Sequence, residues 1–340
     1  MIDIDGSCGE GGGQVLRSAL ALAAISGTPV RITNIRARRP KPGLMPQHLK
    51  AVEAAAAICS ARVEGDRLRS QTLVFEPSAL HAGSFHFDIG TAGSTSLVLQ
   101  TILVPLSLAD GASSVTVTGG THVPWSPCFD YLQMHWLPYV RRIGFNLDLV
   151  LDLAGFYPKG GGRVRAAVRP ASNLTPLQVL ERGALRRIRG LSAVANLDDS
   201  VAERQRRQAR RRLTGRCGTI EIELLRMPSR FRGTLLLLLA EFEQSQCCYY
   251  GLGARGKPAE QVADEAVDAL EEFFSTDGAI DPYLADQLIL PLAYVPGTSE
   301  LRTAKITQHL LTNAEIVRRF VARPIAVEGT IERPGLVRIG

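Results

Sequence analysis

The sequence lacks the features of secreted, disulfide-bonded or membrane-spanning proteins. Its six cysteines include no Cys-x-x-Cys pair and show no zinc-ligand spacing with the histidines, so they indicate reduced thiols and argue against a structural metal. The start of the chain has no apolar signal segment, and the longest apolar run, Thr234–Ala240, is too short to cross a bilayer. These absences predict a cytoplasmic protein without a membrane segment.

The bulk composition is that of a globular protein. With 340 residues, of which 45% are hydrophobic and 21% charged, the chain is long enough to bury a large core, and its length predicts two domains. The net charge of +6 favours a polyanionic partner without requiring one.

Helical and alternating apolar patterns follow one another along the chain, which predicts an α/β fold of repeated layers with units of roughly 70–80 residues. The stretches Leu73–Phe75 and Phe85–Ile89 resemble a strand pair. The composition changes after about Leu180. We therefore predict a main domain made of residues 1–180 and 277–340, with an inserted domain at 181–276. Helices are expected at 14–25, 47–59, 94–108, 129–143, 203–212 and 259–274, and further strands at 30–35, 61–63, 114–118, 145–151, 163–168, 219–223 and 233–241.

A run of glycines stands before the first predicted helix. Gly11–Gly13 lead into a helix beginning near Gln14, where free backbone N–H groups could hold a phosphate, or where the chain could simply turn tightly from strand to helix. The run matches neither Gly-x-Gly-x-x-Gly nor a P-loop. Glu10 and Arg17 flank it.

Two segments are rich in basic residues. Arg36–Lys41 has four cations within six residues, held extended by prolines, and is either an oligoanion contact or a solvated loop. Arginine suits a terminal phosphate because its guanidinium can bind two oxygens. The run Arg204–Arg212 predicts a basic helix, which is either a solvated face or a contact for RNA.

Polar residues lie within or next to two apolar stretches. Gln100 lies within an apolar helix, so its amide must either bond to the backbone or reach a ligand. Tyr283–Gln287 precedes another apolar stretch, and by itself it is typical of a helix start with a capping acid.

Several separated motifs, in this order, make the chain resemble the RNA 3′-terminal phosphate cyclase family. They are Gly9–Ser18, Ile35–Leu49, Ile89–Ser94, Gly155–Gly162, Tyr283–Gln287 and His309–Asn313. The resemblance implies a large domain of three βαβαββ-type modules, with a smaller inserted α/β domain. It also implies an enzyme that uses ATP and a divalent metal, Mg or Mn, to convert an RNA 3′-terminal phosphate into a 2′,3′-cyclic phosphodiester.

The resemblance assigns roles to individual residues. His309 would be the nucleophile that becomes covalently adenylylated, since a neutral imidazole is nucleophilic near neutral pH. AMP would then pass to the RNA 3′-phosphate, giving an RNA-pp-A end, and the 2′-hydroxyl would close the ring. The ATP site would be lined by Gln100, Tyr283, Leu284, Ala285, Asp286 and Gln287, and the RNA phosphate or metal would be held by Glu10, Arg17, Arg36, Arg39 and Gln47.

One position departs from the family pattern. The family commonly has Arg or His before Gly155, where this chain has Ala154.

Two other functions are alternatives to the cyclase: a non-enzymatic RNA-binding scaffold and a transferase related to the enolpyruvyl transferases. The intact His309–Asn313 segment favours the enzyme. Because every residue given a chemical role lies outside 181–276, the insert is expected to be dispensable for the covalent step.

Overall fold

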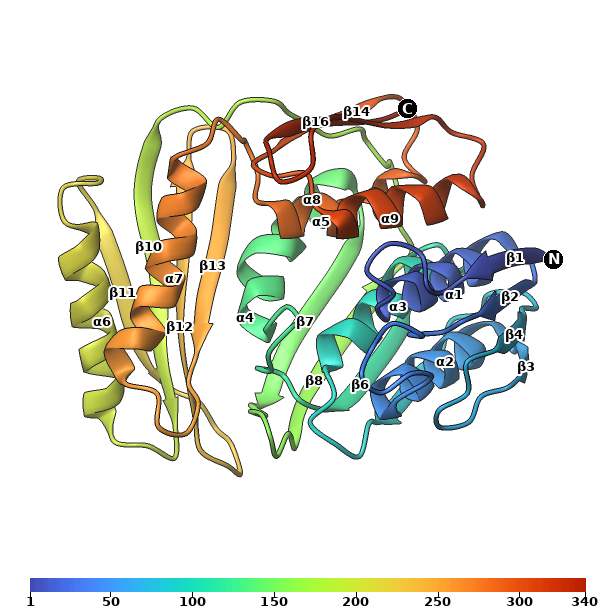
Figure 1. The fold of residues 1–340 in the computed structure, drawn as a ribbon, viewed down its shortest axis with the longest axis horizontal. Helices are drawn as coiled ribbons and strands as arrows, with labels where there is room; N and C mark the ends of the chain where they lie inside the picture. The colour runs from blue at the N-terminus through green and yellow to red at the C-terminus, as the bar shows by residue number, and fades with distance from the viewer.

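The computed structural model describes residues Met1 to Gly340 and contains four sheets of four strands, packed with helices (Figure 1). Three of the sheets share one topology. The strand order is first, second, fourth, third, where the first two strands are parallel and the others antiparallel. Each of these three units therefore has the order βαβαββ, which confirms the predicted repeat.

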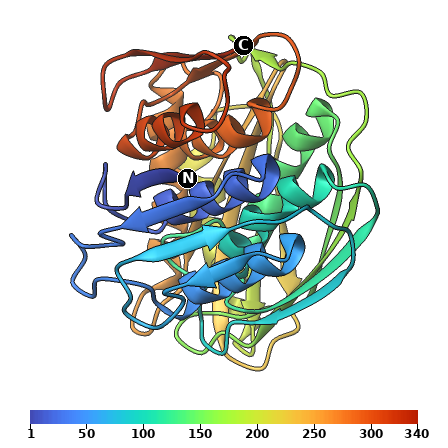
Figure 2. The same ribbon diagram turned by 90° about the vertical axis from the view of Figure 1, so that its right-hand side faces the viewer.

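The three modules follow one another along the chain, and the first faces the viewer in Figure 2. The first consists of β1 (Ile2–Asp5), α1 (Gln14–Ser26), β2 (Val30–Thr33), α2 (Pro46–Cys59), β3 (Arg62–Glu64) and β4 (Leu73–Glu76). The second consists of β5 (Ser84–Asp88), α3 (Thr95–Ser107), β6 (Ser113–Gly119), the helical segment α4 (Phe129–Tyr131), η1 (Leu132–Trp136) and α5 (Leu137–Ile143), β7 (Asn146–Leu153) and β8 (Gly162–Arg169). The third consists of β9 (Gln178–Val179), α8 (Pro282–Leu292), β14 (Ser299–Thr303), α9 (Gln308–Arg318), β15 (Ile325–Gly329) and β16 (Gly335–Ile339).

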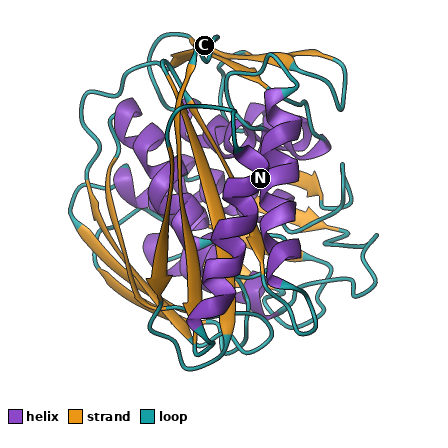
Figure 3. Cartoon of the chain, turned by 90° about the vertical axis from the view of Figure 1, so that its left-hand side faces the viewer, coloured by secondary structure: helices purple, strands orange, loops and turns teal.

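The segment between β9 and α8 forms the fourth sheet, with strand order β11-β10-β12-β13 and two helices beside it (Figure 3). It is the segment that we interpret as an inserted domain. Its elements are β10 (Leu185–Ala195), α6 (Asp199–Leu213), β11 (Ile220–Arg226), β12 (Gly233–Phe242), β13 (Gln246–Leu252) and α7 (Ala259–Phe274).

The central strand β12 explains how this sheet is held. Its leucines alternate between two apolar clusters, since successive side chains in a strand point to opposite faces. Leu236 and Leu238 pack with α6 and α7, whereas Leu235, Leu237 and Leu239 join the core of the main body. Strand β12 is therefore buried on both faces, and the unbroken leucine run is needed for that.

Most predicted elements are found within two residues of their expected ends, but two expectations are wrong. The strands β4 and β5 do not pair, because β4 joins β2 and β3 while β5 joins β6 in another module. Alternation identifies a strand but not its partner. The basic segment 36–41 is not extended either. It forms successive turns, with Arg36 at φ +54°, and the Arg36 guanidinium donates to the carbonyls of Lys41 (2.7 Å) and Gly43 (2.9 Å).

The predicted helix 129–143 contains a π-helical turn, η1, at its centre. No helix in the structure combines the length and apolarity that crossing a membrane requires.

Candidate active site

His309 lies in the first turn of α9, at the end of the helix that faces the glycine run. The hydroxyl of Thr307 caps this helix by accepting from the N–H of Leu310 (3.1 Å), which fixes the direction in which the chain enters it. The His309 Nε2 lies 2.9 Å from Oε2 of Glu10, and both side chains are 42% exposed. The imidazole is thus oriented by a carboxylate and remains accessible to a ligand.

The glycine loop needs glycine because it passes very close to α9. Gly9 has φ +59°, and a Cβ at this position would lie 2.0 Å from Oγ1 of Thr312. Only a residue without a side chain lets the backbone come so near to α9. The close approach is what brings Glu10 to His309.

A chain of polar contacts joins α1, α8 and α9 beside the imidazole. Gln14 donates to Oδ1 of Asp286 (2.7 Å), and Asn313 donates to the carbonyl oxygen of Asp286 (2.9 Å). Ser18 in turn donates to Oδ1 of Asn313 (2.7 Å). Since α1 belongs to the first module and α8 and α9 belong to the third, these contacts hold the two modules in register at the site.

Asp286 has a perturbed acidity. Burial raises its pKa from 3.8 to about 6, while the nearby His309 and Arg17, together with the hydrogen bonds from Asn313 and Gln14, pull the pKa back down. A carboxyl group with so high a pKa beside a nucleophilic side chain is typical of a functional site.

A small cavity of about 80 Å³ opens beside Asp286. Across it the amide of Gln100, which is half-buried rather than buried, donates to Oε1 of Gln287 (2.6 Å) in another module. A volume of this size can hold only part of a nucleotide. The residues that line it are Gln14, Arg17, Ser18, Ala21, Gln100, Val104, Trp136, Asp286, Gln287, Leu290, Pro291 and Asn313.

The segment Tyr283–Gln287 is divided between the cavity and its surroundings. Asp286 and Gln287 line the cavity, whereas the side chains of Leu284 and Ala285 are fully buried in the core and do not reach it. Tyr283 is 60% exposed and packs edge-on against Tyr249, with 6.4 Å between the ring centroids. The helix α8 begins just before this segment, and its capping acid is Asp281.

The predicted phosphate contacts gather around the glycine loop, but they are not equivalent. Burial lowers the pKa of Arg17 from its ordinary value to about 10, and the guanidinium lies beside the cavity. Arg39 points toward the loop, 3.6 Å from Oε2 of Glu10. Arg36 is instead occupied by the carbonyls of its own turn, and Gln47 accepts from the N–H of Ser94 (3.1 Å) at the start of α3.

His48 is a site residue that sequence reasoning missed. It is buried, and burial together with Arg17 and Arg36 lowers its pKa to about 3, so it stays neutral at physiological pH. Its Nδ1 accepts from the N–H of Met45 (3.1 Å), which places the proton on Nε2. That nitrogen and Arg17 both lie against Gly13. The predicted helix 47–59 could have indicated His48 as a site residue, because it places His48 in the first turn next to Gln47.

The residues present fit a divalent metal only as part of a nucleotide complex. No group of three or more His, Cys, Asp or Glu side chains is arranged to hold a metal ion. Glu10 is the exposed carboxylate beside His309, and magnesium is commonly held by one or two carboxylates together with substrate phosphates. Such an ion would arrive with ATP rather than reside in the protein.

The arginine run on α6 divides into two sets. Two of the arginines form ion pairs with acids of α7. Arg204 lies 2.6 Å from Glu260, and Arg212 lies 2.6 Å from Asp268. The other set has no carboxylate partner and lines a groove of about 710 Å³ between α6 and the loop that follows it. These residues are Arg206, Arg207, Arg210 and Arg211.

Ala154 is the departure from the family pattern. It is fully buried, and its N–H donates to the carbonyl of Pro228 (2.7 Å) where the main body meets the inserted segment.

Comparison with known proteins decides the family. The family model described as RNA 3′-terminal phosphate cyclase matches residues 8–327. The chain belongs to the RNA 3′-terminal phosphate cyclase family. It is 44% identical to an RNA 3′-terminal phosphate cyclase of Methylococcus capsulatus, over 100% of this chain and 96% of the relative, and 43% identical to one of Nostoc punctiforme, over 96% of each.

A further relative has a similar identity. The RNA 3′-terminal phosphate cyclase of Hyperthermus butylicus is 46% identical over 94% of this chain and 92% of the relative. Among solved structures, an enolpyruvyl transferase of Streptomyces tendae aligns over 99% of this chain and about half (47%) of its own, at 12% identity and a TM-score of 0.39.

Proposed function

We propose that this protein is a cytoplasmic RNA-processing ligase that uses ATP to convert an RNA 3′-terminal phosphate into a 2′,3′-cyclic phosphodiester. Membership of the cyclase family supports the overall reaction. The observation that supports the covalent route is the accessible imidazole of His309, oriented by Glu10 next to the Asp286 cavity.

The first step forms a bond from the His309 imidazole to the α-phosphorus of ATP and breaks the bond to the β-phosphate, so pyrophosphate leaves. Glu10 orients the ring, so that the imidazole is already positioned for attack when ATP binds. Asp286 is ionised above about pH 6 and can stabilise the positive charge that the imidazole gains as it bonds to phosphorus.

The second and third steps use the RNA end. An oxygen of the RNA 3′-phosphate attacks the adenylyl phosphorus, the P–N bond to His309 breaks, and an RNA-pp-A anhydride forms. The vicinal 2′-hydroxyl then attacks the RNA phosphorus and AMP leaves. The anhydride supplies the leaving group that a bare phosphate lacks, and the proximity of the 2′-hydroxyl favours ring closure.

The terminal phosphate would lie over the glycine loop. Arg17 and Arg39 point there, the Nε2–H of His48 is a neutral donor beside them, and the first N–H groups of α1 are not capped by a side chain. A magnesium or manganese ion bound with ATP would be held by Glu10 and would neutralise phosphate charge there. The unpaired arginines of α6 would bind the phosphodiester backbone of longer RNA.

Self-adenylylation tests the proposal. The protein incubated with ATP labelled at the α-phosphate and a divalent metal should form an acid-labile, base-stable adduct, and the His309→Ala protein should form none while keeping its melting temperature. Undiminished labelling of His309→Ala would refute the assignment of the nucleophile. A wild-type protein that binds RNA and forms no adduct would favour the non-enzymatic RNA scaffold.

A further inference from the structure

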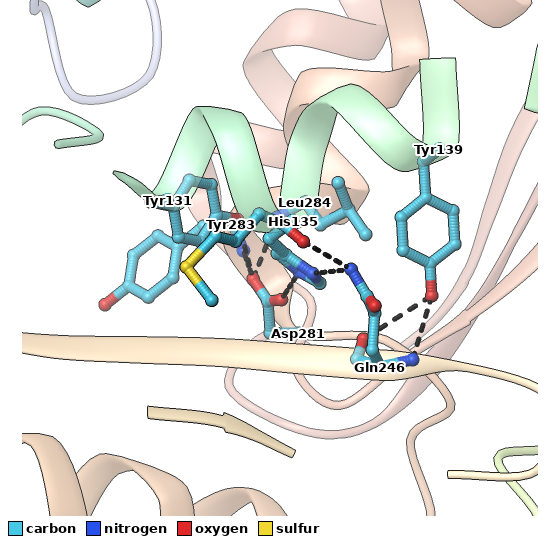
Figure 4. A network of polar contacts seen from close by, with 8 residues as sticks. Tyr131, His135, Tyr139, Gln246, Asp281, Tyr283 and Leu284 are labelled. Carbon is cyan, nitrogen blue, oxygen red and sulfur yellow. Dashed lines mark hydrogen bonds and ion pairs between the residues drawn. The ribbon is translucent and has the colours of Figure 1, made fainter. Parts of the chain in front are cut away.

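A second polar cluster lies buried at the start of α8, outside the cavity. It joins three parts of the chain: the π-helical turn η1, the first residue of β13 and the residue that caps α8 (Figure 4). His135 and Asp281 are both fully buried and form a hydrogen-bonded pair through Nε2 and Oδ2. Buried charged groups are rare unless they are paired, so this cluster needs an explanation beyond packing.

The Asp281 carboxylate is fully used as an acceptor. Oδ1 accepts from the N–H groups of Tyr283 (3.1 Å) and Leu284 (2.9 Å) in the first turn of α8, and from the hydroxyl of Tyr131 (3.2 Å). Burial and the neighbouring Asp281 raise the pKa of Tyr131, which keeps its hydroxyl a donor. The carboxylate therefore fixes the first turn of α8 to Tyr131, at the end of α4.

Gln246 determines how His135 meets this carboxylate. Its side-chain amide donates to the carbonyl of Met134 (3.0 Å) and to Nδ1 of His135 (3.1 Å). Turning the amide over would set its oxygen against the Met134 carbonyl oxygen, so the amide must present N–H to both. Nδ1 of His135 is then an acceptor, and Nε2–H is left to donate to Asp281.

Gln246 of the inserted segment is linked through His135 and Asp281 to α8, the helix of the proposed nucleotide site. Gln246 belongs to β13, and α8 carries Asp286 and Gln287 one turn beyond its capped end. We propose that Gln246 and His135 are positioning residues, through which the inserted segment holds the first turn of α8 in the place that nucleotide binding requires. This inference rests on the proposed function, because it takes α8 to be a nucleotide-binding helix.

The same strand offers a way to separate positioning from simple docking. The backbone N–H and carbonyl of Gln246 bond to the hydroxyl of Tyr139 at 3.1 and 3.4 Å, and a change of the Gln246 side chain leaves those contacts in place. Tyr250, also on β13, donates to the carbonyl of Ser126 (2.6 Å) and has no contact with His135. Tyr250→Phe removes this interface hydrogen bond and keeps the ring, which packs edge-on against Tyr131 with 6.2 Å between the ring centroids.

The test compares Gln246→Met with Tyr250→Phe in the full-length protein. Methionine keeps the volume of glutamine and removes both amide hydrogen bonds. We expect Gln246→Met to raise the KM for ATP in self-adenylylation about five- to tenfold with kcat within twofold, which is the size of effect known for residues that act through a neighbour. Tyr250→Phe should leave both constants unchanged, and nitrogen-15 NMR should find His135 protonated on Nε2 in the wild type.

Three results would overturn the inference. The first is an unchanged KM for ATP in Gln246→Met, and the second is a fall in kcat and melting temperature that Tyr250→Phe reproduces. Either would assign the cluster to stability alone. The third is a His135 protonated on Nδ1. Failure of the proposed function looks different, because then the wild type itself would form no adduct. The inference also revises the expectation that the insert is dispensable for the covalent step.

Discussion

Glu10 in the glycine loop holds the imidazole of His309, with Oε2 and Nε2 2.9 Å apart. The two residues lie near opposite ends of the chain, and the close passage of Gly9 over Thr312 brings them together. A carboxylate in this position can orient the ring and hold a cation that arrives with ATP.

The Glu10 contact predicts a graded loss of self-adenylylation. Glu10→Ala removes an ionic hydrogen bond of about 1.5–3 kcal/mol, which corresponds to roughly tenfold or more in rate. Glu10→Gln retains an acceptor and should lose less. Single-turnover labelling measures both, with Glu53→Ala, an exposed acid paired with Lys50 on α2, as the control. Equal rates for Glu10→Ala and wild type would show that the contact is incidental.

Arg39 should act on the RNA steps. Arg39→Ala is expected to slow cyclisation by pre-adenylylated protein about tenfold, because a charge-assisted contact to the terminal phosphate is lost, while self-adenylylation changes less. Arg36→Ala should also slow cyclisation more than self-adenylylation, and should lower the melting temperature as well, because Arg36 closes its own turn. Arg31→Ala, an exposed arginine paired with Asp3, is the control. An equal loss in both steps would move Arg39 to the ATP site.

The raised pKa of Asp286 predicts a pH-dependent stability difference. The folded protein keeps this proton up to about pH 6, whereas the unfolded chain releases it near 3.8, so ionising Asp286 lowers the free energy of unfolding as the pH rises from 4 to 6. Asp286→Asn cannot ionise there. The free energy of unfolding of Asp286→Asn minus that of the wild type should therefore grow by roughly 2 kcal/mol from pH 4 to pH 7, allowing for partial exposure of the carboxyl.

Urea unfolding at the two pH values measures this difference. A constant difference between Asp286→Asn and wild type would mean that the carboxyl titrates normally. The same variant should lose self-adenylylation, since a group that costs stability at a site is retained for its chemistry.

The unpaired arginines of α6 should matter only for longer RNA. Changing Arg207 and Arg210 to glutamine should weaken binding of an RNA of about 20 nucleotides and lower the slope of log K against log salt by about 1.4, at roughly 0.7 per phosphate contact in single strands. Self-adenylylation should not change.

The control for this pair removes the same charge elsewhere. Arg165 and Arg169 on β8 are exposed and paired with Asp152 and Asp148, and their replacement by glutamine should leave the salt slope as it is. If both pairs lowered the slope equally, the effect would be one of net charge, and the groove would have no role of its own.

The local pattern of the sequence was enough to predict many of the helices and strands. The apolar periodicity of 14–25 and 259–274 defines α1 and α7, because a helix that buries one face must repeat its apolar residues every three or four positions. The separated motifs from Gly9–Ser18 to His309–Asn313, taken in their order, were enough to indicate the family.

What periodicity could not determine is which residues meet. Strand alternation is the same whatever the partner, so β4 and β5 were wrongly paired, and a run of cations looks alike whether it is solvated, closed into a turn as at Arg36 or paired as at Arg212. The contacts between Glu10 and His309, Gln14 and Asp286, and Gln246 and His135 join residues far apart in the chain. Their partners were chosen by the packing of the modules and the inserted segment. Local sequence records only the shape and polarity that each residue brings to that packing.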